Sequence, residues 1–80
     1  MKLRKPANAL ELARKAVTAD PTNAAFVDTL AEALLLNGKE QEALDTERKA
    51  VALAPENLEL QGRLARFREA AGVAEEPPKQ

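Results

Sequence analysis

The chain repeats one short phrase at a fixed distance. The stretches RKAVTADPTN at 14–23 and RKAVALAPEN at 48–57 share their first four residues, the proline and the final asparagine. The two prolines, Pro21 and Pro55, are 34 residues apart. A period between about 20 and 50 residues is typical of solenoids, in which each unit covers its apolar face against the next. The sequence therefore predicts a stack of similar units.

Residues that favour or end helices mark the limits of each unit. Ala, Leu, Glu, Lys and Arg dominate the chain, and all of them favour helix. Pro21 and Pro55 each end a helix, because the residue before a proline is driven out of the helical conformation. Asn23 and Asn57 follow at the same distance and can cap the next helix through their side-chain oxygens. These signals predict the helices and the short connections between them.

Four helices are expected, and together they form one small domain over residues 1–72. Glycines at 38 and 72 end the second and fourth helices, because glycine tolerates the left-handed cap conformation. Connections of about two to five residues force neighbouring helices to lie antiparallel. The expected helices span about 6–19, 24–37, 40–54 and 58–71, and residues 73–80 are expected to be a disordered C-terminal tail.

The segment 24–57 carries small and large apolar residues in a recurrent order. The small residues are alanines that let two helices approach closely, and leucines fill the gaps between them. The residues concerned are Leu30, Ala31, Leu34, Gly38, Ala43, Leu44, Ala50 and Pro55. With these residues the segment resembles a tetratricopeptide repeat. The resemblance implies an all-α fold, an antiparallel helix-turn-helix stack with a right-handed superhelical twist. Glu47 stands where that family favours a bulky apolar residue.

The two flanks of this segment each correspond to half a repeat. Residues 1–23 align with a turn and a second helix, and residues 58–72 align with a first helix, after which Pro77 and Pro78 cannot continue a helical hairpin. Apolar residues of the outer helices would then lack a covering partner. We therefore expect the chain either to self-associate or to be a fragment of a longer array. The candidate self-association residues are Leu10, Val17, Leu60, Leu64 and Phe67.

The resemblance also implies a peptide-binding concave surface, lined by the first helix of each unit. The candidate groove residues are Asp28, Glu32, Leu35 and Leu36 on the second helix, with Gly62, Arg63, Arg66 and Glu69 on the fourth. Leu34, Leu35 and Leu36 cannot all face one side of a helix. At least one should reach solvent, a subunit interface or a bound peptide, and the sequence leaves these three readings open.

The charged residues of these two helices have two interpretations. Arg63, Arg66 and Arg68 could hold an acidic peptide, but the favoured interpretation is a solvated face paired with nearby glutamates at helical spacing, Glu59 and Glu69. Asp28 and Glu32 are expected to form a solvated acidic face. They would repel a terminal carboxylate, so the carboxylate-gripping function known in the resembled family is excluded.

Composition excludes several classes of function. The chain has no His, Cys, Trp, Tyr or Ser among its 80 residues, so the usual general base, metal ligands and hydroxyl nucleophile are absent. The net charge of −1 gives no case for nucleic acid, and no apolar run is long enough for a membrane helix. The sequence predicts a non-enzyme without cofactor or metal, cytoplasmic, that does not bind nucleic acid or membrane.

The function expected from the sequence is a non-catalytic protein–protein interaction scaffold that binds a protein or peptide and forms homo-oligomers. One alternative is a purely structural self-assembly module, in which a two-fold dimer of like ends is favoured over a head-to-tail oligomer. The other alternative is a fragment of a longer repeat array. A helix-turn-helix reader of nucleic acid would need a basic helix and is disfavoured by the near-neutral charge.

Overall fold

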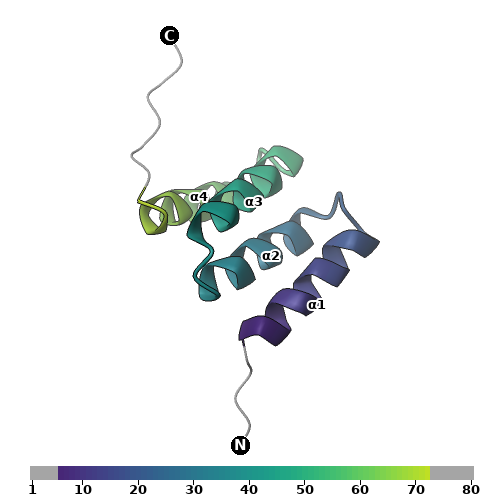
Figure 1. Ribbon diagram of the computed structural model, residues 1–80. Coiled ribbons are helices and arrows are strands. Elements are labelled where there is room, and N and C mark those ends of the chain that lie inside the picture. Colours follow the sequence, from purple (N-terminus) through teal and green to yellow (C-terminus); the bar gives the residue numbers. More distant parts are fainter. Residues whose placement is uncertain (1–5, 73–80) are drawn as a thin grey trace, which may run out of the picture.

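The computed structural model describes residues 6–72 and shows four α-helices (Figure 1). The helices are α1 (Pro6–Ala19), α2 (Ala24–Leu36), α3 (Glu40–Leu53) and α4 (Leu58–Ala70). The described residues contain no strand, so the expected all-α class and the four helices are confirmed. Each observed end lies within one residue of the expected end. The tail expected at 73–80 lies outside the described residues.

Asparagine side chains begin α2 and α4, as the sequence predicts. Asn23 is extended, and its side-chain oxygen accepts a hydrogen bond of 3.2 Å from the backbone N–H of Phe26. Asn57 accepts hydrogen bonds from the backbone N–H groups of Glu59, at 3.0 Å, and Leu60, at 3.2 Å. These bonds satisfy donors that the first turn of a helix cannot pair internally. The two caps stand one repeat apart and set both helices in equivalent positions.

Gly38 ends α2 in a conformation that L-residues rarely adopt. Its φ is 78°, in the left-handed region. The backbone N–H of Gly38 donates to the carbonyl of Leu35, and that of Lys39 donates to the carbonyl of Leu34, both at 3.0 Å. This pair of bonds is a Schellman motif, which closes the last turn of a helix and reverses the chain. The turn brings α3 back against α2.

Successive helices pack against each other, with α2 between α1 and α3 and with α4 against α3 (Figure 1). The core has two clusters of buried side chains. One contains Ala31, Leu34, Ala43, Leu44 and Phe67, and the other contains Val27, Ala50 and Leu60. Small alanines of α2 and α3 face each other at the centre, so the two helices approach closely. Both clusters join α2 and α3 to α4.

For two of the five apolar residues expected to lack cover, Leu60 and Phe67, the structure contradicts the expectation. Leu60 and Phe67 are buried within the monomer, and Phe67 is fully inaccessible to solvent. Leu10 and Leu64 are half-buried against the cluster around Leu34, and Val17 is half-buried against the cluster around Val27. The reason is that α4 turns its apolar side inward onto α2 and α3. Leu60 and Phe67 therefore belong to the core of the monomer, whereas Leu10, Val17 and Leu64 keep part of their surface exposed.

Gly62 is the one glycine within a helix in residues 6–72, and replacing it with alanine should stabilise the protein. The residue is exposed in the middle of α4, and a Cβ added to it would have no heavy atom within 4 Å. Alanine favours a helix interior by roughly 0.5–1 kcal/mol over glycine. We expect Gly62→Ala to raise the free energy of unfolding by about that amount in urea titrations followed by circular dichroism. An unchanged or lower value would contradict the helical conformation at this position.

None of the four described helices has both the length and the apolar character needed to cross a membrane.

Candidate functional site: a groove between α1 and α2

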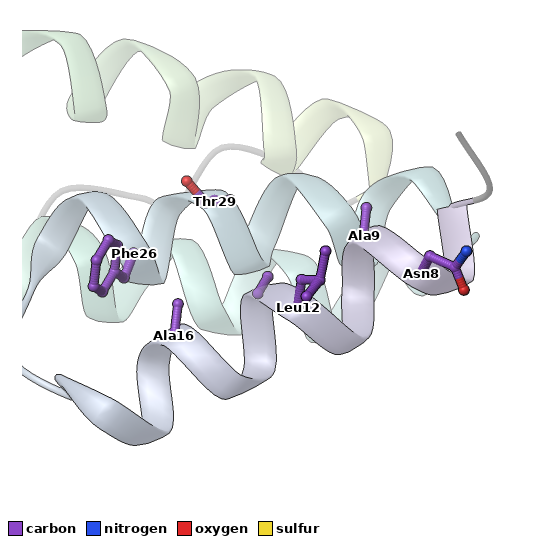
Figure 2. Close-up of a pocket in the computed structure, with 7 residues that line it drawn as sticks. Asn8, Ala9, Leu12, Ala16, Phe26 and Thr29 are labelled. Atoms are coloured by element: carbon purple, nitrogen blue, oxygen red, sulfur yellow. The ribbon is translucent and has the colours of Figure 1, made fainter. Parts of the chain in front are cut away.

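An open groove with a volume of about 590 Å³ lies between α1 and α2 (Figure 2). We call it the α1/α2 groove. Its residues come from the first three turns of α1 and the first half of α2. They are Asn8, Ala9, Leu12, Ala13, Ala16, Phe26 and Thr29.

The α1/α2 groove is apolar and accessible. Its two large side chains are Leu12, which is 67% exposed, and Phe26, which is 37% exposed. Figure 2 shows Leu12 and Phe26 at the groove, with Ala9 and Ala16 as short side chains of α1. Since alanines form most of the α1 side, their short side chains allow another backbone to approach closely there. Such a surface favours contact with another apolar element over contact with water.

The repeat explains why this groove is open. The residues one period after the groove residues lie on α3 and α4. They occupy equivalent positions in the second unit, yet they are buried. The four pairs, each 34 residues apart, are Leu12 and Thr46, Phe26 and Leu60, Ala9 and Ala43, and Ala16 and Ala50. In the second unit, Val27 of α2 packs with Ala50 and Leu60. Among residues 6–72 no helix covers the first unit as α2 covers the second, so the α1/α2 groove is left open.

The acidic and basic residues proposed for a peptide groove are brought together, but they pair with each other. Arg63 on α4 donates to Asp28 on α2, whose side chain is almost fully buried. Arg66 donates to Glu32 at 3.2 Å in the same direction, from α4 to α2. The prediction that Asp28 lies on a solvated acidic face is therefore wrong. The arginines use partners across the helix interface because α4 packs on α2, where the sequence reading had paired them along their own helix.

Glu47 lies beneath this charge pair and is fully buried on α3. Burial raises the pKa of Glu47 to about 8, helped by a hydrogen bond to Asp28 and by the negative charges of Asp28 and Glu32, and opposed by Arg63. Without a proton on Glu47, Asp28 Oδ1 and both carboxyl oxygens of Glu47 have no hydrogen-bond partner among the described residues, and a protonated Glu47 can donate to Asp28. Glu47 is therefore held as a neutral acid at neutral pH, joining α3 to the charge pair of α2 and α4.

The remaining proposed groove residues are divided between core and surface. Leu34 is fully buried, Leu35 is half-buried against the same cluster, and Leu36 is 69% exposed. Leu36 is thus the leucine that the other helices leave uncovered, and the choice among solvent, a subunit interface and a bound peptide stays open. Gly62 and Glu69 are exposed on α4. These residues do not join the α1/α2 groove, and none of the groove's own residues had been singled out from the sequence.

A sequence signal for the groove was nevertheless present. Phe26 and Leu12 are large apolar residues at positions whose counterparts one period later are Leu60 and Thr46. Apolar residues at a position that faces a neighbouring unit, in a unit whose neighbour is missing, indicate an uncovered face. Comparing the two units residue by residue would have pointed to α1 and the start of the second helix.

Comparison of the chain with protein-family models and with curated proteins found no match in either. Within residues 6–72, no group of three or more acidic side chains is placed so that it could hold a metal ion. The apolar α1/α2 groove is the feature on which a functional proposal can rest.

Proposed function

We propose that this protein is a non-catalytic protein–protein interaction scaffold of the tetratricopeptide type. Two features support the proposal: the 34-residue period of the sequence and the alternation of antiparallel helices linked by short turns. In such stacks, each unit exposes the face that its neighbour would cover. Binding by shape and apolar contact is the function that this architecture supports best.

The binding site in this proposal is the α1/α2 groove, and its ligand is a helix. The observation that carries the proposal is the difference in burial between equivalent residues. Leu12 and Phe26 are exposed, whereas Thr46 and Leu60 are buried under the helix that covers the second unit. A helix bound in the groove would lie on α1 and α2 as α2 lies on α3 and α4. It would bury both large side chains and run antiparallel to α1.

The charges around the groove define the chemistry of that helix. In the second unit, Asp28 of the covering helix meets Arg63 and the buried Glu47. At the groove, the equivalent residues are Thr29 and Ala13, which carry no charge. A charge on the bound helix at the position of Asp28 would be buried without a partner, which is costly. The ligand should therefore be small and uncharged at that position.

The polar side chains of the groove are consistent with binding rather than catalysis. Asn8 and Thr29 provide an amide and a hydroxyl, neither of which is an acid or base near neutral pH. The Thr29 hydroxyl already donates to the carbonyl of Ala25 at 2.9 Å, so it can only accept a hydrogen bond from a ligand, whereas the Asn8 amide can donate or accept one. The apolar residues supply the affinity. The proposal is thus a docking surface with polar groups at its edge.

A helix joined to the N-terminal side of α1 tests this proposal directly. The added segment copies residues 24–39, with Asp28→Ala and Glu32→Arg in the copy, and leads into Pro6. Packing in the groove should raise the free energy of unfolding by about 1.5–3 kcal/mol, the value for burying one large apolar side chain. The measurement is urea unfolding of the fusion and of the unmodified chain, followed by circular dichroism at low protein concentration.

Two substitutions in the fusion show whether the gain comes from the groove. Leu12→Glu places a charge in the groove and should remove the gain. Leu36→Glu changes an equally exposed leucine outside the groove and should leave the gain intact. A fusion no more stable than the original chain would refute the proposed docking site, and so would an equal gain in the Leu12→Glu fusion.

A further inference from the structure

We propose that the helix bound in the α1/α2 groove is α4 of a second copy of this chain, which joins the copies head to tail. This inference rests on the proposed function, because it names the occupant of the same groove. It starts from the order of the helices. α4 corresponds to the first helix of a unit and α1 to the second helix of a unit, so α4 of one copy and α1 of the next would together complete one repeat.

The outer face of α4 is unpartnered in the same way as the groove. We define this face by Gln61, Gly62, Ala65 and Arg68. Its counterparts on α2, one period earlier, are buried: Val27, Asp28, Ala31 and Leu34. On α4, three of the four residues are exposed, and Arg68 is half-buried. The chain therefore has one unfilled position at α1 and α2 and one helix, α4, whose equivalent face has no neighbour in the described residues.

The α4 outer face and the α1/α2 groove are both uncharged at the positions where the equivalent contact inside the monomer is charged. The α4 outer face has Gly62 at the position of Asp28, and the groove has Ala13 and Thr29 at the positions of Glu47 and Arg63. The charged cluster inside the monomer is therefore replaced by small or uncharged residues on both sides of the proposed contact. No carboxylate or guanidinium would be buried without a partner at that place.

A second match involves the ion pair between Glu32 and Arg66. These residues are 34 apart in the sequence and so stand at the same position in two successive units. In a head-to-tail array, Arg66 of one copy would lie opposite Glu32 of the next. Acidic and basic residues would then alternate along the whole assembly, each acid lying between two arginines. Such complementarity fixes the register of a contact and disfavours others.

The shape of the groove favours this geometry over the two-fold pairing of like ends that the sequence suggested. Two identical concave surfaces placed face to face leave the hollow empty, whereas a helix fills it. A head-to-tail contact uses different surfaces on the two copies, so it leads to rings or open chains. Gln61 and Arg68 are polar, and one helix covers a small area, so the contact should be weak. We expect a monomer near 10 µM and larger species above about 100 µM.

Two exposed-site variants, tested alone and mixed, distinguish the geometries. Ala65→Arg blocks the α4 outer face, and Leu12→Glu blocks the groove. In sedimentation velocity up to about 500 µM, each variant alone should stay monomeric. An equimolar mixture should form a dimer and nothing larger, because each variant keeps one working surface. Normal helicity by circular dichroism establishes that both variants are folded.

Matched controls use the same substitutions at exposed positions outside the contact. Ala52→Arg on α3 is one control. Ala52 and Thr18, its counterpart one period earlier, are both exposed, so this position does not lie in the contact between units. Leu36→Glu is the other, since Ala70, one period later, is also exposed. Both should associate like the unmodified chain.

Three results would overturn the inference. An unmodified chain that stays monomeric at every concentration removes the second copy as occupant, while the stability gain of the fused helix still decides the proposed function by itself. Association of Ala65→Arg at the unmodified level would indicate pairing of two grooves. A mixture that fails to form the dimer would show that the two surfaces do not meet.

Discussion

Replacing Phe67 with alanine should lower the free energy of unfolding by about 3–5 kcal/mol, the range for deleting a fully buried aromatic side chain. Phe67 is inaccessible to solvent and packs with Leu34, Leu44 and two alanines from α2 and α3. It is the largest fully buried side chain, and with Leu60 it packs α4 onto the rest of the fold. A domain this small has a correspondingly small total stability, so the variant should be largely unfolded at 37 °C.

The second phenylalanine of the chain provides the matched control. Phe26 is 37% exposed at the α1/α2 groove, so Phe26→Ala removes the same atoms from a partly solvated position. We expect it to cost less than half as much as Phe67→Ala. Thermal and urea unfolding at low protein concentration compare the two variants. Equal losses in the two variants would contradict the burial of Phe67. A Phe67→Ala variant that is as stable as the unmodified chain but associates less would contradict it too.

The sequence alone predicted the helices because their ends depend on local chemistry. Pro21 and Pro55 exclude the helical conformation from the residues before them, Asn23 and Asn57 cap the following helices, and Gly38 permits the left-handed turn. Each of these effects acts within a few residues. The short connections then predicted that neighbouring helices are antiparallel, and the 34-residue period predicted that alternate helices are equivalent.

Local sequence signals could not predict which neighbours each helix covers with its apolar side. Leu60 and Phe67 stand on a half-unit whose own hairpin partner is not among the described residues, which made them appear uncovered. In the structure, α4 rotates them onto α2 and α3, and its outer face carries Gln61 and Arg68 instead. Which face a helix buries depends on contacts between units, and these follow from the packing of all four helices together.

The charged cluster was missed for a related reason. Pairing of Asp28 with Arg63 joins residues 35 apart, and pairing of Glu32 with Arg66 joins residues 34 apart. Both separations equal the repeat period to within one residue, so opposite charges at that spacing are a signal that could have been sought. Glu47, which stands where the resembled family favours a bulky apolar residue, was the second signal. An acid at a core position indicates a partner on a neighbouring helix.

Stability should fall as the pH rises from about 5 to 8 because of Glu47. Its folded-state pKa is about 8, above its ordinary value of 4.5. Between these values the unfolded chain releases this proton while the folded chain keeps it. The folding equilibrium constant should therefore decrease about tenfold for each pH unit in this range. Below the ordinary pKa both states hold the proton, and above about 8 both release it, so the effect of Glu47 is constant outside this range.

Glu47→Gln isolates this effect, because it replaces the protonated acid by a neutral group of the same shape that can still donate to Asp28. The groups facing this position are Asp28 and Glu32 on α2 and Arg63 on α4, and all remain in the variant. We expect the two proteins to have similar stability near pH 4.5, and the variant to be more stable by several kcal/mol at pH 8. The measurement is the free energy of unfolding in urea at intervals of one pH unit.

Glu40→Gln, at an exposed position in the first turn of α3, is the control and should keep the decline of the unmodified chain. If the curves of the unmodified protein and Glu47→Gln run parallel from pH 4.5 to 8, Glu47 is not a buried neutral acid, and the cluster must be held by the two ion pairs alone.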